Sequence, residues 1–515
     1  MSTFNLSRAL RWNVHRRPEK EALVDADQRL SYAELDRRVD AVAAGFAELG
    51  FGDGDIAAIL ADNSADYIVQ MLAVNRLGGA YVPLNWRLHP DELAHIVNHS
   101  TATLLITEAR WHDAAKQTLA QVSGVEHVVT RAEEAPDGWV RFAQLERSGE
   151  GRGPVADAEK GHDDLQRILY TSGTTSHPKG VMITHGNVIW NMLGQILELE
   201  LSADDRLGLT APLFHVSGQD VPGWTALYLG ATWVVSPSYR GEDIARLIRE
   251  EQLTGMILAA QIINDMMAVE GLDGSELTSL RWLVFGGFAP AQYQRLQQFL
   301  PHVRLVEAFG MTELTNGAAY LDGAHARTKV GSQGPPFPHV DFRVVDDDGE
   351  ELPPGQEGEL TVRGPKVTAG YWRDPEATAA VYRDGWFHTG DYVELDDDGY
   401  LWFVDRKKDM IKSGGENVAS AEIERVLYTH ASVAAAAVVG VPDERWDEVP
   451  KALVILRDGA EATGEELREH CLERLAKFKV PKLFEIVEEL PRNDSGKILK
   501  RELRERERER YRPGA

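Results

Sequence analysis

The sequence predicts an α/β protein. We expect a large N-terminal domain, made of α/β subdomains and a small β-barrel-like unit, followed by a small α+β C-terminal domain. Short apolar runs at 55–63 and 78–85 alternate with helical patterns such as 31–49, which indicates parallel strands covered by helices. Residues 340–405 are rich in strand patterns with Asp-Gly turns, which favours an antiparallel or barrel-like unit. A new mixture of strand and helix patterns begins after Asp405 and is long enough for a separate domain.

Local signals predict the individual elements. Ser31 is expected to cap the helix at 31–49, because Glu34 stands at the spacing of a capping box. The polar segment 131–163 is predicted to be a surface excursion, and the charged tail 501–512 to be a solvated final helix. Further strands are predicted at 102–108, 125–130, 165–172, 231–236, 255–260, 280–287, 303–310, 433–442 and 451–456.

The composition narrows the function classes. With 55 basic and 81 acidic residues the net charge is -26, which argues against nucleic acid or an anionic membrane surface as a partner. Cys471 is the single cysteine, so no intrachain disulfide is expected. The sequence has no apolar run of about 18 residues and no signal-like start, so we expect no membrane span and a cytoplasmic location.

A loop at 170–180, YTSGTTSHPKG, is the first chemical signal. Small hydroxyl residues and glycine directly after a strand offer backbone N–H groups and hydroxyl donors to phosphate oxygens, and Lys179 adds a positive charge. The loop is not a Walker A motif, since the GxxxxGK[ST] pattern is missing. Eleven residues of this kind favour a phosphate loop over an ordinary Ser/Thr-rich turn.

Four further motifs follow along the chain. Taken singly, Asp391 is explained by an N-cap or a turn, Glu313 by a surface acid and Lys497 by a solvated lysine. Their order together with the phosphate loop favours a shared chemical role. The motifs are AFGMTE at 308–313, WFHTGD at 386–391, DRKKDMIKSGGEN at 405–417 and PRNDSGK at 491–497.

The loop and these motifs resemble the adenylate-forming superfamily over almost the whole chain. The superfamily includes acyl-CoA synthetases, 4-coumarate:CoA ligases, firefly luciferase and peptide-synthetase adenylation domains, and the chain is most similar in look to bacterial fatty acyl-CoA synthetases. The resemblance implies two steps: an acid and ATP form an acyl-adenylate and pyrophosphate, and the acyl group then passes to a thiol. It implies ATP, Mg²⁺ and coenzyme A, or a carrier protein's phosphopantetheine, as cofactors.

The resemblance also implies roles for single residues. By this resemblance Glu313 binds Mg²⁺ and Thr312 contacts the α-phosphate. Asp391 binds the ribose hydroxyls, and Lys497 is the lysine that promotes adenylation. Two positions depart from the family, with Ser176 in place of glycine and Phe309 in place of the commoner tyrosine. The implied nucleotide site comprises Thr171, Ser172, Gly173, Thr174, Thr175, Lys179, Phe309, Gly310, Met311, Thr312, Asp391, Arg406 and Lys497.

The resemblance implies an N-terminal domain of residues 1–405 and a mobile C-terminal domain of residues 406–515 with its hinge at Lys408. The thiol is expected to meet the face formed by Lys412, Gly414, Gly415 and Glu416. Three lysines near the thiol side are expected to supply positive charge, although a solvated helix end also explains them; they are Lys477, Lys479 and Lys482. Asp447 and Ser420 depart from the family's usual glycine and proline in this half.

The acid site carries the most open alternatives. His215 resembles a residue beside the acyl carboxylate, but a packed histidine at a strand end is an equal alternative. Phe288 replaces a small residue and is expected to narrow the pocket. We slightly favour Asp220 as an outward, solvated acid over a partner for a substrate ammonium. The expected pocket comprises His215, Ser217, Asp220, Val221, Phe288, Gly310 and Asn316.

These observations support one main hypothesis, an acid:CoA ligase for a fatty or aryl acid, with Lys497, His215 and Thr312 as catalytic residues. A first rival is a stand-alone enzyme that activates an amino or β-amino acid and loads it onto a carrier protein. A second rival is a nucleotide-binding protein without catalysis, against which Lys497, Glu313 and Asp391 argue. A luciferase-type oxygenase shares the motifs, but nothing in the sequence favours it.

Overall fold

The computed structural model describes residues 4–26, 28–171, 178–286, 290–413, 416–443, 445–492 and 498–510. The chain forms two compact units, which are described separately. The first unit comprises Met1–Gly287, Gln294–Asp341 and Arg363–Phe387, and the second comprises Phe288–Tyr293, Phe342–Val362 and His388–Ala515.

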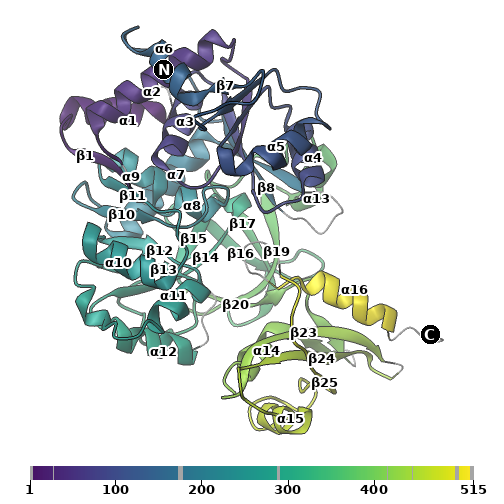
Figure 1. Cartoon of the computed structure of the whole chain (residues 1–515). Helices are drawn as coiled ribbons and strands as arrows, with labels where there is room; N and C mark the ends of the chain where they lie inside the picture. Colours follow the sequence, from purple (N-terminus) through teal and green to yellow (C-terminus); the bar gives the residue numbers. More distant parts are fainter. Residues whose placement is uncertain are drawn as a thin grey trace. The chain divides into compact units, whose positions relative to one another are not determined.

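A seven-stranded sheet forms one half of the first unit (Figure 1). Its strands run in the order β7-β6-β5-β3-β4-β8-β9 and are parallel, except that β9 is antiparallel to β8. The central strand β3 is buried throughout, as its unbroken apolar sequence predicts for a sheet covered on both faces. The strands are β3 (Ile56–Leu60), β4 (Ala80–Pro83), β5 (Leu104–Thr107), β6 (His127–Thr130), β7 (Val140–Arg141), β8 (Leu165–Thr171) and β9 (Lys179–Thr184).

An eight-stranded sheet forms the other half, in the order β15-β14-β13-β12-β10-β11-β1-β2. Its centre is parallel, and the two edge strands β2 and β15 are antiparallel to their neighbours. The strands are β1 (Glu21–Asp25), β2 (Gln28–Ser31), β10 (Arg206–Leu209), β11 (Thr232–Val235), β12 (Gly255–Ile257), β13 (Trp282–Phe285), β14 (Arg304–Met311) and β15 (Asn316–Tyr320).

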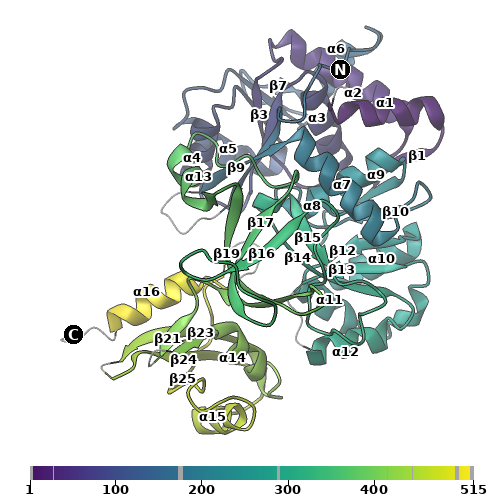
Figure 2. The same ribbon diagram turned by 180° about the vertical axis from the view of Figure 1, so that it is seen from behind.

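Helices cover these sheets, and α7 and α9 pack against each other, as Figure 2 shows from behind. The predicted capping box of α2 is confirmed. The Ser31 hydroxyl accepts a hydrogen bond from the backbone N–H of Glu34, and the Glu34 carboxylate accepts one from the backbone N–H of Ser31. The helices are α1 (Ser7–Arg16), α2 (Tyr32–Glu48), α3 (Ala65–Arg76), α4 (Pro90–Ser100), α5 (His112–Leu119), α6 (Phe142–Gly149), α7 (His185–Leu199), α8 (Val216–Asp220), α9 (Gly223–Leu229), α10 (Gly241–Glu251), α11 (Ala260–Met267), α12 (Pro290–Phe299) and α13 (Pro375–Val381).

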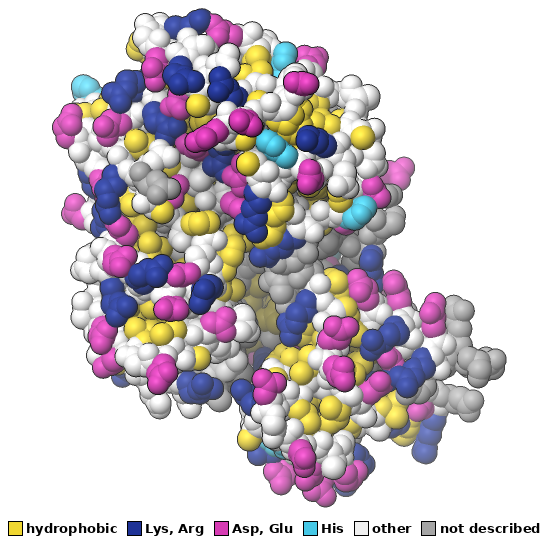
Figure 3. Space-filling model, viewed as in Figure 1, with side chains coloured by type: hydrophobic (Ala, Val, Ile, Leu, Met, Phe, Trp, Pro, Cys, Tyr) yellow, Lys and Arg dark blue, Asp and Glu magenta, His cyan; other side chains and the backbone are white. Residues whose placement is uncertain are grey.

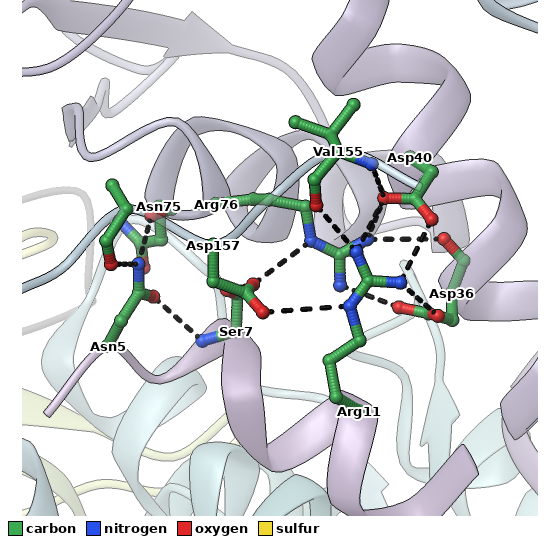
Figure 4. A network of polar contacts seen from close by, with 10 residues as sticks. Asn5, Ser7, Arg11, Asp36, Asp40, Asn75, Arg76, Val155 and Asp157 are labelled. Atoms are coloured by element: carbon green, nitrogen blue, oxygen red, sulfur yellow. Dashed lines mark hydrogen bonds and ion pairs between the residues drawn. The ribbon is translucent and has the colours of Figure 1, made fainter. Parts of the chain in front are cut away.

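A buried ion-pair network ties α1, α2 and α3 to the segment around Asp157 (Figure 4). The Arg76 guanidinium is completely buried and lies 2.6 Å from Asp36 and 2.8 Å from Asp40. Arg11 reaches the same two carboxylates at 2.6 and 2.8 Å. Because each charge has an opposite partner, the network avoids the penalty of an isolated buried charge.

Two smaller sheets draw most of their strands from the second unit, although residues 382–383 and 386–387 of the first of these sheets belong to the first unit. One has the order β16-β17-β19-β18, with β20 paired to β19, and confirms the β-rich region predicted at 340–405. The other has the order β22-β21-β24-β23, with β25 parallel to β24. The strands are β16 (Asp341–Val345), β17 (Glu357–Arg363), β18 (Tyr382–Arg383), β19 (Trp386–Leu395), β20 (Leu401–Arg406), β21 (Ile411–Ser413), β22 (Glu416–Val418), β23 (Val433–Asp443), β24 (Asp447–Leu456) and β25 (Leu483–Ile486), and the helices are α14 (Ser420–Leu427), α15 (Gly464–Leu472) and α16 (Lys500–Arg510).

Two expectations about surface segments are wrong in part. Residues 131–163 include α6, which packs on α2 and buries Phe142 and Leu145. The tail helix α16 packs on β23 and buries Leu503, while its Glu507 carboxylate lies 2.5 Å from the buried Lys451 ammonium. Polar and charged residues together with glycine make up most of both segments, so the composition gives no sign of the few side chains that are buried.

Candidate active site

The base of the predicted phosphate loop is an antiparallel hairpin. Thr171, at the end of β8, pairs with Lys179, at the start of β9, so the two ends of the loop lie opposite each other. The remaining predicted loop residues, Ser172, Gly173, Thr174 and Thr175, lie outside the described residues. The sheet therefore fixes the position of the Lys179 backbone at the start of β9.

Glu313 and Tyr371 lie beside this hairpin. The Tyr371 hydroxyl donates to Glu313 Oε1 at 3.0 Å, and the Lys179 ammonium lies 5.0 Å from the centre of the Tyr371 ring. Burial and the Glu313 carboxylate raise the pKa of Tyr371, so its hydroxyl stays protonated. Backbone bonds hold this arrangement, since Trp372 donates to the Gly180 carbonyl at 2.7 Å. Our sequence reasoning missed Tyr371, because no local pattern links it to Glu313.

The segment predicted for adenine and the α-phosphate runs along the end of β14 into a short 3₁₀ turn, Thr312–Leu314. Phe309 is 7% exposed, whereas Met311 and Thr312 are half-buried. Gly310 pairs with Gly317 of β15, and a Cβ at Gly310 would lie 2.5 Å from the Asn316 carbonyl oxygen. Glycine is thus required at 310, where two backbones approach closely.

The surroundings of Glu313 fit the implied Mg²⁺. In proteins this ion is usually held by one or two carboxylates together with substrate phosphates and water. Glu313 supplies a buried carboxylate that Tyr371 orients. Within the described ranges no group of three or more His, Cys, Asp or Glu side chains could hold a metal by itself. Substrate phosphates and water are the further ligands that an ion at Glu313 would take.

His215 precedes α8 and is its N-cap residue. Its Nε2 atom is buried and has no hydrogen-bond partner among the residues that the structure describes. Burial, with a smaller effect of Arg87, lowers the pKa of His215 to about 4, so the ring is neutral near pH 7. A neutral ring is able to donate one hydrogen bond but carries no charge toward a carboxylate. Ser217 is half-buried and Val221 is buried.

The expectation that Asp220 is solvated is wrong. Asp220 is 1% exposed and forms an ion pair with Arg167 of β8, which is completely buried. Arg167 also donates to Gln166 Oε1 at 2.5 Å. Burial raises the pKa of the Asp220 carboxyl and the Arg167 guanidinium opposes that shift. Since the pair already neutralises Asp220, the alternative of a substrate ammonium loses its main support.

In the second unit, Asp391 and Arg406 are cross-strand partners on β19 and β20. Asp391 is 2% exposed, and its Oδ1 lies 3.0 Å from Arg406 Nε. The structure therefore brings together these two predicted ribose-binding residues. The neighbouring Lys407 pairs with Asp347 at 2.9 Å and with Glu359 at 3.2 Å, whereas Lys408, the predicted hinge, is exposed.

The predicted thiol face falls on the hairpin of β21 and β22. Ser413 pairs with Glu416 across this hairpin, and Lys412 is exposed on β21. The remaining predicted residues of this face, Gly414 and Gly415, lie outside the described residues, as do Phe288 and Lys497.

Exposed aromatic side chains near the predicted lysines are a feature that our sequence reasoning missed. Trp446 and Phe478 are 37% and 46% exposed. The Lys482 ammonium lies 4.9 Å from the Trp446 ring centre, and the Arg445 guanidinium lies 4.8 Å from it. Lys479 is paired with Glu422 at 2.7 Å. Exposed rings with adjacent cations are able to stack on a base and to meet phosphates.

Comparison with known proteins assigns the chain to a family. The family described as "AMP-binding enzyme" matches residues 10–372, and the one described as "AMP-binding enzyme C-terminal domain" matches residues 422–497. The chain is 39% identical over 499 residues to a feruloyl-CoA synthase of Amycolatopsis sp, covering 96% of this chain and 98% of that protein. It is 37% identical over 492 residues to an indoleacetate–CoA ligase of Aromatoleum aromaticum, covering 95% of each.

A solved structure shows the same fold. The crystal structure of ATP-bound MatB from Rhodopseudomonas palustris matches with a TM-score of 0.91 and 30% identity, over 99% of this chain and 100% of that one. The predicted α/β architecture with a small C-terminal part is therefore confirmed. The chain belongs to the adenylate-forming superfamily of AMP-binding enzymes and is an AMP-forming acid–thiol ligase of the acyl-CoA synthetase type.

Proposed function

We propose that this ligase activates an aryl or arylalkyl carboxylic acid and transfers it to coenzyme A. The observation that carries the proposal is the near full-length similarity to two ligases named for ferulate and indoleacetate. The buried Arg167–Asp220 pair also supports it, because a neutralised Asp220 is a poor partner for an amino acid's ammonium. A fatty acid is the second candidate, which the substrate comparison below addresses.

In the proposed first step a carboxylate oxygen attacks the α-phosphorus of ATP and pyrophosphate leaves. Both reactants are anions, so the site needs cations and N–H donors more than a base. Lys179 and the hydroxyl-rich loop are proposed to hold the leaving pyrophosphate, and Lys497 to neutralise the charge that develops on the α-phosphate. Mg²⁺ held by Glu313 supplies charge neutralisation when it is bound.

Tyr371→Phe tests the role of Glu313. The variant removes the hydroxyl that orients the Glu313 carboxylate at 3.0 Å but keeps the ring beside Lys179. We expect the KM for Mg-ATP to rise roughly 3- to 10-fold, because one hydrogen bond to a charged group is lost. The KM for the acid should stay the same. Steady-state kinetics at varied Mg²⁺ measure this, and an unchanged Mg-ATP dependence would contradict the role.

In the proposed second step the CoA thiol attacks the acyl carbonyl and AMP leaves. A chain with net charge -26 needs a local site for the anionic nucleotide of CoA. In the view of Figure 3, basic and acidic side chains are interspersed over the surface. The group of Trp446, Arg445 and Lys482 is proposed to bind the CoA nucleotide by ring stacking and charge.

Trp446→Ala tests this acceptor site. We expect the KM for CoA to rise about 5- to 150-fold, because stacking of a base on an aromatic ring contributes about 1–3 kcal/mol. ATP–pyrophosphate exchange, which needs no CoA, should be unchanged. Trp12→Ala is the matched control, since Trp12 is 51% exposed in the first unit. Equal effects of both substitutions on the KM for CoA argue against the site.

The domain division at residue 405, the hinge at Lys408 and the thiol face around Lys412 and Glu416 remain proposals. The same holds for a cytoplasmic location, which the lone Cys471 and the use of ATP and CoA support. No helix among the described residues is both long enough and apolar enough to cross a membrane.

A substrate comparison tests the proposed acid. Pyrophosphate release is measured with aryl, arylalkyl, fatty, amino and β-amino acids, with and without CoA. We expect the highest kcat/KM for an aryl or arylalkyl acid and a thioester product with CoA. Turnover of an amino acid alone, with no effect of CoA, would reject the proposal.

A further inference from the structure

Lys366 is a buried ammonium in the first unit that neither the motifs nor the proposed mechanism uses. It is 2% exposed. Its Nζ donates to Asn191 Oδ1 at 2.7 Å and to the Gly317 carbonyl oxygen, and it lies 4.5 Å from the Phe337 ring centre. An ammonium has three N–H donors, and only two acceptors are found for Lys366 among the described residues.

Other buried polar atoms near Lys366 also lack partners within the described part of the chain. They are Asp220 Oδ1, Asn316 Nδ2 and Tyr320 Oη. These residues belong to α8 and β15, which pack together. Asn191 links them to Lys366, because its Nδ2 donates to the Asp220 carbonyl at 3.3 Å while its Oδ1 accepts from Lys366. Buried polar atoms are rarely left unsatisfied, so this cluster is suited to a polar ligand.

The charge of the cluster indicates the kind of ligand. Asp220 pairs with Arg167, and no carboxylate of the described residues forms an ion pair with Lys366, on which Asp220 acts at longer range. Burial lowers the pKa of Lys366 to about 7, and an acceptor from a ligand would relieve that cost. Lys366 needs an acceptor and Asp220 Oδ1 needs a donor. A substrate hydroxyl is able to serve both, since its oxygen accepts from Lys366 and its proton is donated to Asp220 Oδ1. A second carboxylate would accept from Lys366 but has no proton to donate to Asp220 Oδ1.

The position of the cluster indicates which end of the acid it meets. His215 is the N-cap of α8 and Asp220 its last residue, five positions later and about 7 Å along the helix axis. With the reacting carboxylate near His215, as the resemblance implies, groups at this separation are within reach of the far end of an aryl acid. We propose that Lys366 is a specificity-determining residue that binds a hydroxyl group at the far end of the acid substrate. This inference rests on the proposed acid activation.

The test compares cinnamate with 4-hydroxycinnamate by AMP formation in the presence of CoA. We expect wild-type kcat/KM to be about 10- to 100-fold higher for the hydroxylated acid, as for a charge-assisted hydrogen bond. Lys366→Met, similar in length but uncharged, should bring this ratio to within about 3-fold of one while cinnamate is still used. Lys116→Met, at an exposed position of α5, is the matched control and should keep the wild-type ratio.

Because the readout is a ratio within one protein sample, partial unfolding of a variant does not change it. Lys366→Gln, which keeps a donor for Asn191 and Gly317, serves as the second variant if Lys366→Met fails to fold. Three results would overturn the inference: no wild-type preference, an equal loss for both acids, or a preference for 4-carboxycinnamate over the hydroxylated acid. AMP formation with cinnamate keeps the proposed acid activation intact in all three cases, whereas no AMP with any acid rejects that function itself.

Discussion

Lys497→Ala is expected to abolish ATP–pyrophosphate exchange, lowering its rate by at least about 10²- to 10³-fold. In the first step two anions react, and charge shifts to the α-phosphate oxygens as pyrophosphate leaves. A lysine at this point compensates a charge that is larger in the transition state than in the ground state, so its loss lowers kcat more than it raises KM. The family match of the C-terminal domain ends at this residue.

The same variant should still convert chemically synthesised acyl-adenylate and CoA to the thioester at a rate within a few-fold of wild type, because the second step does not need this charge. Measuring both half-reactions on one preparation separates a missing catalytic group from a misfolded protein. Lys116→Ala, at an exposed position, is the control for exchange. Normal exchange in Lys497→Ala, or equal loss of both half-reactions, contradicts the assigned role.

Arg167→Met is expected to lower the free energy of unfolding by about 3–5 kcal/mol, because it leaves the Asp220 carboxylate buried without its partner. Both side chains of this pair are completely buried, so water is not able to replace the lost guanidinium. The substitution also removes the 2.5 Å bond from Arg167 to Gln166. Urea denaturation followed by tryptophan fluorescence measures the change.

Arg110→Met is the matched control, because Arg110 pairs with Asp62 at 2.8 Å while its side chain is 65% exposed. Its loss should change stability by no more than about 1 kcal/mol. The double variant Arg167→Met/Asp220→Asn should recover part of the loss, since it removes the uncompensated charge. Equal effects at Arg167 and Arg110 would show that the buried pair does not carry the stability assigned to it.

Local patterns predicted the elements well, since their signals lie within a few residues. The Ser31–Glu34 capping box depends on two side chains three positions apart, and β3 on five consecutive apolar residues. The strands of both large sheets likewise follow apolar runs bounded by turns. The charged tail misled the prediction, because the single leucine of α16 and the pairing of Glu507 with Lys451 give no local signal.

The site was predictable where it depends on motifs and not where it depends on distant pairing. Asp391 and Arg406 follow from motifs and are partners in the structure. Asp220 pairs with a residue 53 positions away, and Glu313 with one 58 positions away. Whether an acid is solvated, paired or substrate-facing depends on such tertiary contacts, so the sequence alone favoured the wrong environment for Asp220. Tyr371 and Lys366 were missed for the same reason, because their contacts are with residues far away in the sequence.

The most direct test of the central claim follows an oxygen label through the reaction. The purified protein is incubated with ATP, CoA, Mg²⁺ and an aryl acid whose carboxylate carries oxygen-18, and the products are analysed by mass spectrometry. Attack on the α-phosphorus predicts one labelled oxygen in AMP, none in pyrophosphate, and a thioester that keeps the other labelled oxygen. Label in inorganic phosphate together with ADP, or label-free AMP, would contradict an acyl-adenylate intermediate.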